Sequence, residues 1–180
     1  MSNIELPVLH GARVTLRRPR EDDVAARLQL GADAEIHRMY GGNLSDLRPL
    51  TEERARRWVK QLLDHEYAWV IEAGALIGHI RLDHVDFRDR RASLAVGIED
   101  KARLGIGLGT EAMRLAIGYA FNVLKLHRLS VRVVKYNARA IRAYEKCGFV
   151  VEGTEREAAF VDGIWHDDII MGLLARDYVG

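Results

Sequence analysis

The sequence predicts an α/β protein, in the α+β sense, with a mixed sheet that carries helices on both faces. Residues 67–98 contain successive strand-like segments joined by short turns, which is typical of an antiparallel meander. From residue 105 onward, helical and strand-like segments alternate, as they do in a sheet covered by helices. The 180 residues show no repeat and no linker-like stretch, so we expect a single domain over residues 1–180.

The first half of the chain supplies strands on either side of two helices. A strand over residues 14–18 ends at Pro19, a residue that also suits the first turn of a helix. Thr51 is a good N-cap, and the two glutamates that follow it favour the start of a second helix. The predicted segments are helix 21–30, a helix after Thr51 with its apolar stripe over residues 55–63, and strands 68–72, 76–84 and 92–98.

The second half alternates between helix and strand. A glycine-rich turn at residues 105–109 opens a long helix that reaches about Lys125. Gly148 has the position of a helix C-terminal glycine. The remaining predicted segments are strand 129–134, helix 137–147, and strands 149–154 and 165–173 around the turn Asp162-Gly163.

Composition excludes several classes of function. The 27 Lys and Arg residues almost balance 26 Asp and Glu residues, giving a net charge of +1, whereas a protein that binds nucleic acid through its phosphates is usually far more basic.

The single cysteine, Cys147, excludes an internal disulfide and we interpret it as a structural thiol. The histidines lack ligand spacing, so no metal is predicted. With no signal peptide and no membrane-length apolar run, we expect a cytoplasmic location and neither nucleic acid nor membrane as partner.

Three alternate glycines, Gly105, Gly107 and Gly109, lie between a strand and a helix. Because glycine lets the backbone approach a ligand closely and a helix start has free N–H groups, this loop suits a phosphate or pyrophosphate. A P-loop is excluded because no lysine follows the glycines, and the dinucleotide fingerprint fails in both its spacing and its acid. A loop required only for tight packing is the alternative interpretation.

The loop is followed by a second motif, Asn137-Ala-Arg-Ala-Ile-Arg-Ala-Tyr-Glu-Lys-Cys-Gly-Phe149. With the Gly-Thr-Glu-Ala run at residues 109–112 and the segment 160–167, this order of motifs resembles the GCN5-related N-acetyltransferase (GNAT) superfamily, in its ribosomal-protein N-terminal and spermidine acetyltransferase branch. The resemblance covers about residues 9–174. It implies a GNAT fold with a splayed, mostly antiparallel sheet. It also implies an enzyme that moves the acetyl group of acetyl-CoA directly to a primary amine in a ternary complex.

The resemblance implies where acetyl-CoA, the cosubstrate, binds. The pyrophosphate would lie on the glycine loop and the pantetheine arm in the gap between strands 92–98 and 129–134. The implied coenzyme-binding residues are Ile98, Glu99, Leu104, Gly105, Ile106, Gly107, Leu108, Gly109, Thr110, Asn137 and Tyr144. Leu104 departs from the Gln or Arg that relatives often have, so backbone donors, with Arg103 nearby, would hold the phosphate. Asn137 also suits a helix N-cap.

Tyr144 is the implied general acid, because a phenol stays protonated at neutral pH and can give its proton to the departing thiolate. A core tyrosine is the alternative reading of the same residue. The general base is uncertain, since Ser93 occupies the position where relatives often have glutamate. The other acids and imidazoles considered for this role are His79, Asp83, His84 and Glu111.

The acceptor is a protein N-terminus or a small-molecule amine, and the sequence does not choose between them. Trp58, Trp69, Trp165 and Tyr40 are candidate walls of its pocket. Two alternatives to an enzyme stay open: a noncatalytic acyl-CoA-binding or sensing domain, and a protein-interaction module of the same fold. A homodimer is consistent with the resemblance, because many relatives are dimers.

Overall fold

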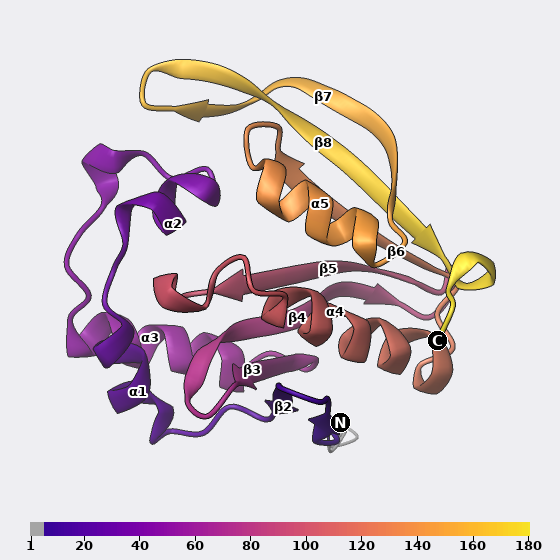
Figure 1. Cartoon of the computed structure of the whole chain (residues 1–180), viewed down its shortest axis with the longest axis horizontal. Coiled ribbons are helices and arrows are strands. Elements are labelled where there is room, and N and C mark those ends of the chain that lie inside the picture. Colours follow the sequence, from indigo (N-terminus) through magenta and orange to yellow (C-terminus); the bar gives the residue numbers. More distant parts are fainter. Residues whose placement is uncertain (1–5) are drawn as a thin grey trace.

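The computed structural model of the chain describes residues 6–180 and is built on one eight-stranded sheet (Figure 1). The strands are β1 (Leu9–His10), β2 (Thr15–Arg17), β3 (Ala68–Glu72), β4 (Leu76–Asp86), β5 (Arg91–Ile98), β6 (Arg128–Val134), β7 (Val150–Val161) and β8 (Ile164–Leu174). Their order is β1-β2-β3-β4-β5-β6-β8-β7. The pair β5–β6 is parallel and the other pairs are antiparallel. The predicted mixed, mostly antiparallel sheet is confirmed.

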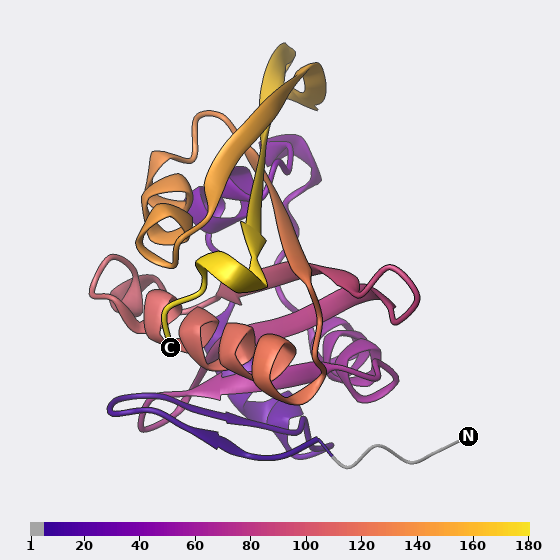
Figure 2. The same ribbon diagram turned by 90° about the vertical axis from the view of Figure 1, so that its right-hand side faces the viewer.

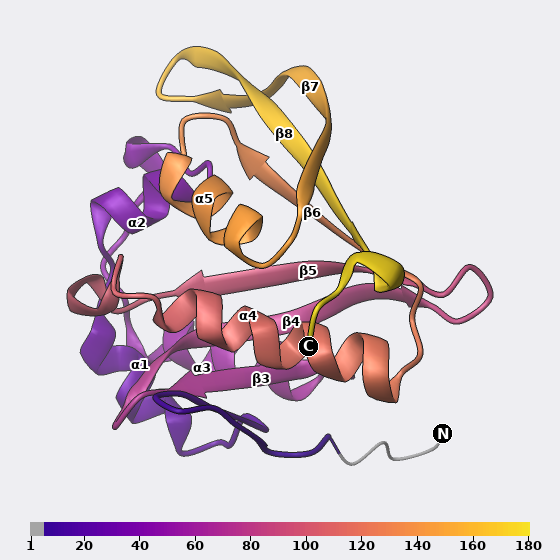
Figure 3. The ribbon, with the colours of Figure 1, turned by 45° about the vertical axis from the view of Figure 1, so that its right-hand side comes forward.

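The parallel pair at the centre of the sheet is joined over only part of its length. Residues Arg91–Ser93 of β5 pair with Arg128–Ser130 of β6, although β5 continues to Ile98 and β6 to Val134. Beyond the paired residues the two strands diverge, so that β1–β5 form one arm of the sheet and β6–β8 the other (Figure 3). The splay implied by the family resemblance is therefore present.

Helices cover both faces of the sheet, as predicted (Figure 2). They are α1 (Asp23–Leu30), α2 (Ala34–Met39), α3 (Glu52–Leu63), α4 (Leu108–Gly118) and α5 (Ala138–Lys146). Helices α4 and α5 lie on one face, while α1 and α3 lie on the other. Within residues 6–180, none of these helices combines the length and the apolar character needed to cross a membrane.

The alternation of side chains along β3 explains how both faces are filled. Trp69 and Ile71 point into the larger core beneath α4, and both are fully buried. Ala68 and Val70 point the other way and pack with Leu62 of α3. The apolar residues of β3 thus pack against helices on both faces of the sheet.

The first helix begins later than predicted, at Asp23 rather than residue 21. The Asp23 carboxylate accepts hydrogen bonds from the Arg17 guanidinium at 2.6 and 3.0 Å and from the Arg20 backbone N–H at 2.7 Å. These bonds tie the end of β2 to the start of α1. The two acids at residues 21 and 22 precede the helix as a turn instead of forming its first turn.

The long helix predicted to reach Lys125 is α-helical only as far as Gly118, and a π-helical turn over Tyr119–Val123 follows it. A side chain at Gly118 would lie 3.0 Å from the Tyr178 hydroxyl, so the helix packs closely on the C-terminal segment at this point. The apolar stripe predicts the helix but not this change of pitch.

Two further differences concern α2 and the last hairpin. Helix α2 was not predicted; its six residues are too few for a periodic pattern, and it starts where the Asp33 carboxylate accepts the Ile36 N–H. Strands β7 and β8 are longer than the predicted 149–154 and 165–173, because β7 continues through the irregular, polar stretch between Glu155 and Ala159. The turn Asp162-Gly163 is confirmed, with φ values of 50° and 82°.

Candidate active site

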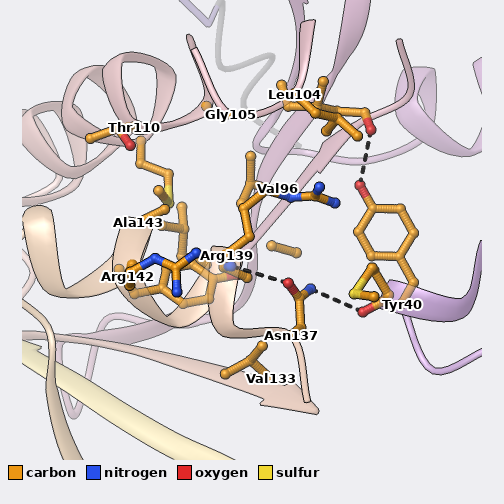
Figure 4. A pocket seen from close by; sticks show the side chains of 18 of the residues that line it. Tyr40, Val96, Leu104, Gly105, Thr110, Val133, Asn137, Arg139, Arg142 and Ala143 are labelled. Atoms are coloured by element: carbon orange, nitrogen blue, oxygen red, sulfur yellow. Dashed lines mark hydrogen bonds between the residues drawn. The ribbon is translucent and has the colours of Figure 1, made fainter. Parts of the chain in front are cut away.

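A cavity of about 490 Å³ opens where β5 and β6 diverge. Its walls come from both arms of the sheet, from the start of α4, from the length of α5, and from α2 (Figure 4). The volume is within the range of small-molecule sites. Its lining includes Met39, Tyr40, Ala95, Val96, Ile98, Arg103, Leu104, Gly105, Gly107, Gly109, Thr110, Arg132, Val134, Asn137, Tyr144 and Asp168.

The glycine loop forms one end of this cavity. Gly105 and Gly107 have φ values of 75° and 89°, in the left-handed region that other residues rarely adopt. Gly107 is the N-cap of α4 and supplies no side-chain acceptor, so the first N–H groups of the helix are left for a ligand. The Arg13 guanidinium braces the loop by donating to the Ile106 carbonyl at 2.9 Å. The geometry suits an anion such as pyrophosphate.

Eight of the eleven predicted coenzyme-binding residues line the cavity: Ile98, Leu104, Gly105, Gly107, Gly109, Thr110, Asn137 and Tyr144. Ile106 is exposed on the loop and Leu108 is buried beneath it. Glu99 lies outside the lining, since its N–H donates to the Ile77 carbonyl at 2.7 Å and its carboxylate faces Arg27 at 3.4 Å. The coenzyme contacts of Ile106, Leu108 and Glu99 therefore remain predictions, because these residues do not line the cavity.

Asn137 connects α5 to α2 across the mouth of the cavity. Its side-chain oxygen accepts the Ala140 N–H at 3.1 Å, as expected for an N-cap, and its side-chain nitrogen donates to the Met39 carbonyl at 3.1 Å (Figure 4). The predicted cap is therefore present. The contact with the coenzyme remains a prediction.

Tyr144 is both a core residue and a cavity residue. It is 7% exposed and packs edge-on against Phe149, with ring centroids 5.8 Å apart. Burial raises the pKa of Tyr144 to about 12, with a smaller contribution from Cys147, so the phenol keeps its proton at neutral pH. Burial likewise raises the pKa of the Cys147 thiol to about 11, which supports the interpretation of Cys147 as a structural thiol.

Ser93 lies outside the cavity lining, at the end of β5 that still pairs with β6. Its hydroxyl is 3.2 Å from the Ser130 hydroxyl. Ser93 and Ser130 form the last pair before the strands separate, and the cavity lining on β5 begins at the next residue, Leu94. No residue is assigned as the general base.

The other candidate bases are also held away from the cavity. Burial alone would raise the pKa of Glu111, but hydrogen bonds from the backbone and guanidinium of Arg13 lower it overall. Asp83 is occupied by His65 at 2.9 Å and by Arg81 at 2.8 Å. His84, which lies on β4 next to Asp83, is exposed.

His79 is largely buried outside the cavity lining, where it packs edge-on against Trp58 and lies 3.7 Å from the Glu99 carboxylate. Burial, with added repulsion from Arg81 and Arg27, lowers the pKa of His79 to about 4. An unfolded histidine titrates near pH 6.5, so His79 binds its proton more readily in the unfolded chain. Its contribution to stability is thus present above pH 6.5 and is lost as the pH falls toward 4.

We expect His79→Gln to weaken the pH dependence of stability in this window. The wild-type free energy of unfolding should fall more steeply than that of the variant between pH 6.5 and 4, with a total difference of at most about 3 kcal/mol. Urea unfolding at a series of pH values measures both curves. Parallel curves would show that His79 is not held neutral by its surroundings.

Sequence reasoning missed Asp168, a buried acid that lines the cavity. The residue is 3% exposed, its Oδ2 lies 3.1 Å from Nε of Arg132, and its Oδ1 has no hydrogen-bond partner in the described structure. The available signal was an acid directly before the apolar run of the last predicted strand. Of the proposed aromatic walls, Tyr40 lines the cavity, Trp69 is in the core, Trp58 packs on His79, and Trp165 is exposed.

Helix α2 and the residues after it hold the two arms of the sheet together at the cavity. The Tyr40 hydroxyl donates to the Ile98 carbonyl on β5 at 3.4 Å. On the other arm, the Arg38 carbonyl accepts the Tyr136 hydroxyl at 2.5 Å, beside the bond from Asn137 to Met39. The segment therefore spans the opening of the splayed sheet (Figure 1).

A family model described as an acetyltransferase (GNAT) domain matches residues 13–150. The chain belongs to the GNAT acetyltransferase family. Within residues 6–180, no group of three or more histidine, cysteine, aspartate or glutamate side chains has the geometry to hold a metal ion.

Named relatives support the predicted branch of the GNAT family. The spermidine N(1)-acetyltransferase of Escherichia coli K12 is 31% identical over 97% of this chain and 91% of its own. Two shorter matches are YjcK of Bacillus subtilis, a probable N-acetyltransferase, at 42% over 43% of each chain, and the E. coli K12 ribosomal protein uS5-alanine N-acetyltransferase, at 30% over 41% of this chain and 38% of its own. This chain thus spans less than half the length of YjcK.

The fold is also that of solved acetyltransferases. The spermidine N-acetyltransferase of Vibrio cholerae, in a structure with CoA and spermine, aligns with a TM-score of 0.78 and 24% identity over 94% of this chain and all of the other. The predicted GNAT fold is confirmed. The family and its named members also confirm the predicted class of enzyme, an acetyl-CoA-dependent N-acetyltransferase.

Proposed function

We propose that this GNAT protein transfers the acetyl group of acetyl-CoA directly to a primary amine, either a protein N-terminus or a small-molecule amine. One observation carries the proposal: a single cavity is lined by the glycine loop, by the buried phenol of Tyr144 and by an acid on the opposite arm. Coenzyme and acceptor would therefore meet in one space, as a ternary complex requires.

In the proposed complex the coenzyme occupies the side of the cavity formed by α4, α5 and β5. The N–H groups at the start of α4 bind the pyrophosphate, which explains why Leu104 can replace a polar side chain: the donors belong to the backbone. Arg103, which lines the cavity with its side chain partly exposed, supplies a nearby positive charge. The pantetheine arm then lies between the diverging strands, next to Ile98.

The proposed chemistry is nucleophilic attack by a neutral amine. The nitrogen lone pair forms a bond to the thioester carbonyl carbon, the carbon–sulfur bond breaks, and the thiolate takes the proton of the Tyr144 phenol. The acceptor ammonium first loses one proton to solvent to give the neutral amine. After the carbon–nitrogen bond forms, the nitrogen loses a second proton to solvent as the amide forms, and Tyr144 is reprotonated from solvent. Because the pKa of Tyr144 is near 12, the phenol is available as a donor throughout the neutral range.

Release of free CoA thiol from acetyl-CoA tests the proposal. Spermidine, single amino acids, aminoglycosides and peptides with ribosomal-protein N-termini form the acceptor panel, and we expect at least one class to give turnover well above hydrolysis. Calorimetric titration with acetyl-CoA runs in parallel. Binding without turnover on any amine would support a sensing domain instead, and absence of binding would support an interaction module.

A further inference from the structure

We propose that Arg142 and Lys146 bind the 3′-phosphate of the coenzyme, so that the site selects acyl donors that carry this phosphate over donors that lack it. The inference deepens the proposed function and rests on it. Donors with the same pantetheine arm but no 3′-phosphate include thioesters of dephospho-CoA and acyl groups on a protein-bound phosphopantetheine. The two cations therefore decide which acyl donors the protein accepts.

The cavity carries an excess of positive charge. Within residues 6–180 its lining contains one acid, Asp168, and five cationic side chains: Arg103, Arg132, Arg139, Arg142 and Lys146. Carboxylates lie 3.1 to 3.8 Å from three of these cations: Asp168 beside Arg132, Glu35 beside Arg139 and Asp100 beside Arg103. In the part of the chain that the structure describes, Arg142 and Lys146 have no carboxylate within ion-pair distance. Their two charges are therefore left for a ligand.

Arg142 and Lys146 are like charges one turn apart on α5. Side chains four residues apart lie on the same face of a helix, and two cations at this spacing repel each other. Arg114 adds a third positive group beside them, because its guanidinium donates to the Lys146 carbonyl at 3.1 Å. A phosphate has three oxygens and up to two negative charges, so it relieves the repulsion and accepts charge-assisted hydrogen bonds from both side chains.

The pair lies at the glycine-loop end of the cavity. The next residue, Cys147, has its Sγ 3.7 Å from the carbonyl of Thr110, in the first turn of α4. The end of α5 thus packs against the helix whose first N–H groups bind the pyrophosphate in the proposed complex. Figure 4 shows Arg142 and Thr110 on one side of the cavity and Tyr40 on the other. The 3′-phosphate belongs to the ribose next to the pyrophosphate, so the nucleotide end of the coenzyme lies nearest the pair.

The test compares acetyl-CoA with acetyl-dephospho-CoA, which lacks only the 3′-phosphate. In calorimetric titrations of the wild-type protein, the Kd of acetyl-dephospho-CoA should be about tenfold or more above that of acetyl-CoA. In the Arg142→Gln/Lys146→Gln variant, the two Kd values should lie within about threefold of each other, and the Kd of acetyl-dephospho-CoA should match the wild-type value. An equal loss of affinity for both nucleotides would overturn the assignment, since the pair would then serve the pyrophosphate or the fold. Unchanged affinity for acetyl-CoA would overturn it outright.

Lys135→Gln/Arg176→Gln is the matched control. It removes the same two charges from exposed residues that line no part of the cavity. The ratio of the two Kd values should stay within about twofold of the wild-type ratio, because charges at a distance are screened by salt. If the control lowers the ratio as much as the α5 variant does, net charge alone explains the preference and Arg142 and Lys146 have no specific role.

Folding and acetyl transfer are checked separately. Arg142 and Lys146 are exposed and glutamine suits a helix, so the melting temperature of the ligand-free α5 variant should be equal or higher. The titrations contain no acceptor, so they give a result even if no amine is acetylated, the outcome that defeats the proposed function. Equal affinity of the wild-type protein for both nucleotides, or binding of neither, would overturn the inference about Arg142 and Lys146 on its own terms.

Discussion

Replacing Tyr144 with phenylalanine is expected to lower kcat about 100-fold or more, the usual contribution of a positioned general acid. The substitution removes one hydroxyl and keeps the ring, its packing on Phe149 and the shape of the cavity. The Kd of acetyl-CoA should therefore stay within about twofold. Steady-state thiol release and calorimetric titration measure the two quantities separately.

Tyr119→Phe is the matched control for that experiment. Tyr119 is 5% exposed and packs edge-on against Trp69, but it lies outside the cavity lining. The same loss of a buried hydroxyl should leave kcat within about twofold. If Tyr144→Phe turns over at the wild-type rate, the phenol is not the proton donor and Tyr144 is only a core residue.

Replacing Gly107 with valine is expected to weaken acetyl-CoA binding at least tenfold. The φ of 89° is a left-handed conformation that a β-branched residue adopts only under strain, on the order of 1–3 kcal/mol. The new Cβ would also lie 3.1 Å from the Arg13 guanidinium that braces the loop. Calorimetry gives the Kd, and thermal unfolding shows how much of the loss reflects a less stable fold.

Gly109→Ala separates backbone strain from crowding of the ligand. Gly109 does not have a positive φ, and its Cβ would meet the Ile98 side chain at an ordinary 3.5 Å. Thermal stability should therefore be unchanged, and a fall in coenzyme affinity would report close approach of the ligand alone. If Gly107→Val folds and binds acetyl-CoA normally, the pyrophosphate does not lie on this loop.

Strong periodicity explains which elements could be predicted. Helix α3 and helix α5 have clear apolar faces and good N-caps, Thr51 and Asn137, and both were located to within a residue or two. The six residues of α2 have too little periodicity to be recognised, and Asp33, whose carboxylate accepts the Ile36 N–H, is the local signal at the start of the helix. Polar residues within β7 likewise concealed its length.

The parts of the candidate site that could be predicted are those formed by one continuous segment of the sequence. The glycine loop is one continuous segment, so its conformational requirements could be read directly at Gly105 and Gly107. Whether Ser93 faces the cavity depends on the residue at which two strands separate, and that point is set by the packing of the arms. Asp168 became significant only when β8 paired with β6 and placed its carboxylate beside Arg132.

The hydrogen bonds that α2 and Tyr40 make to both arms of the sheet affect how the cavity binds ligands. Because Tyr40 holds β5 and the carbonyls of Arg38 and Met39 hold the other arm, the width of the opening is set during folding. In the proposed complex, a flexible coenzyme would enter a preorganised slot, and the entropy lost on binding would be mainly that of the coenzyme rather than of the protein. The short helix acts as a spacer that maintains the separation of the sheet before either substrate arrives.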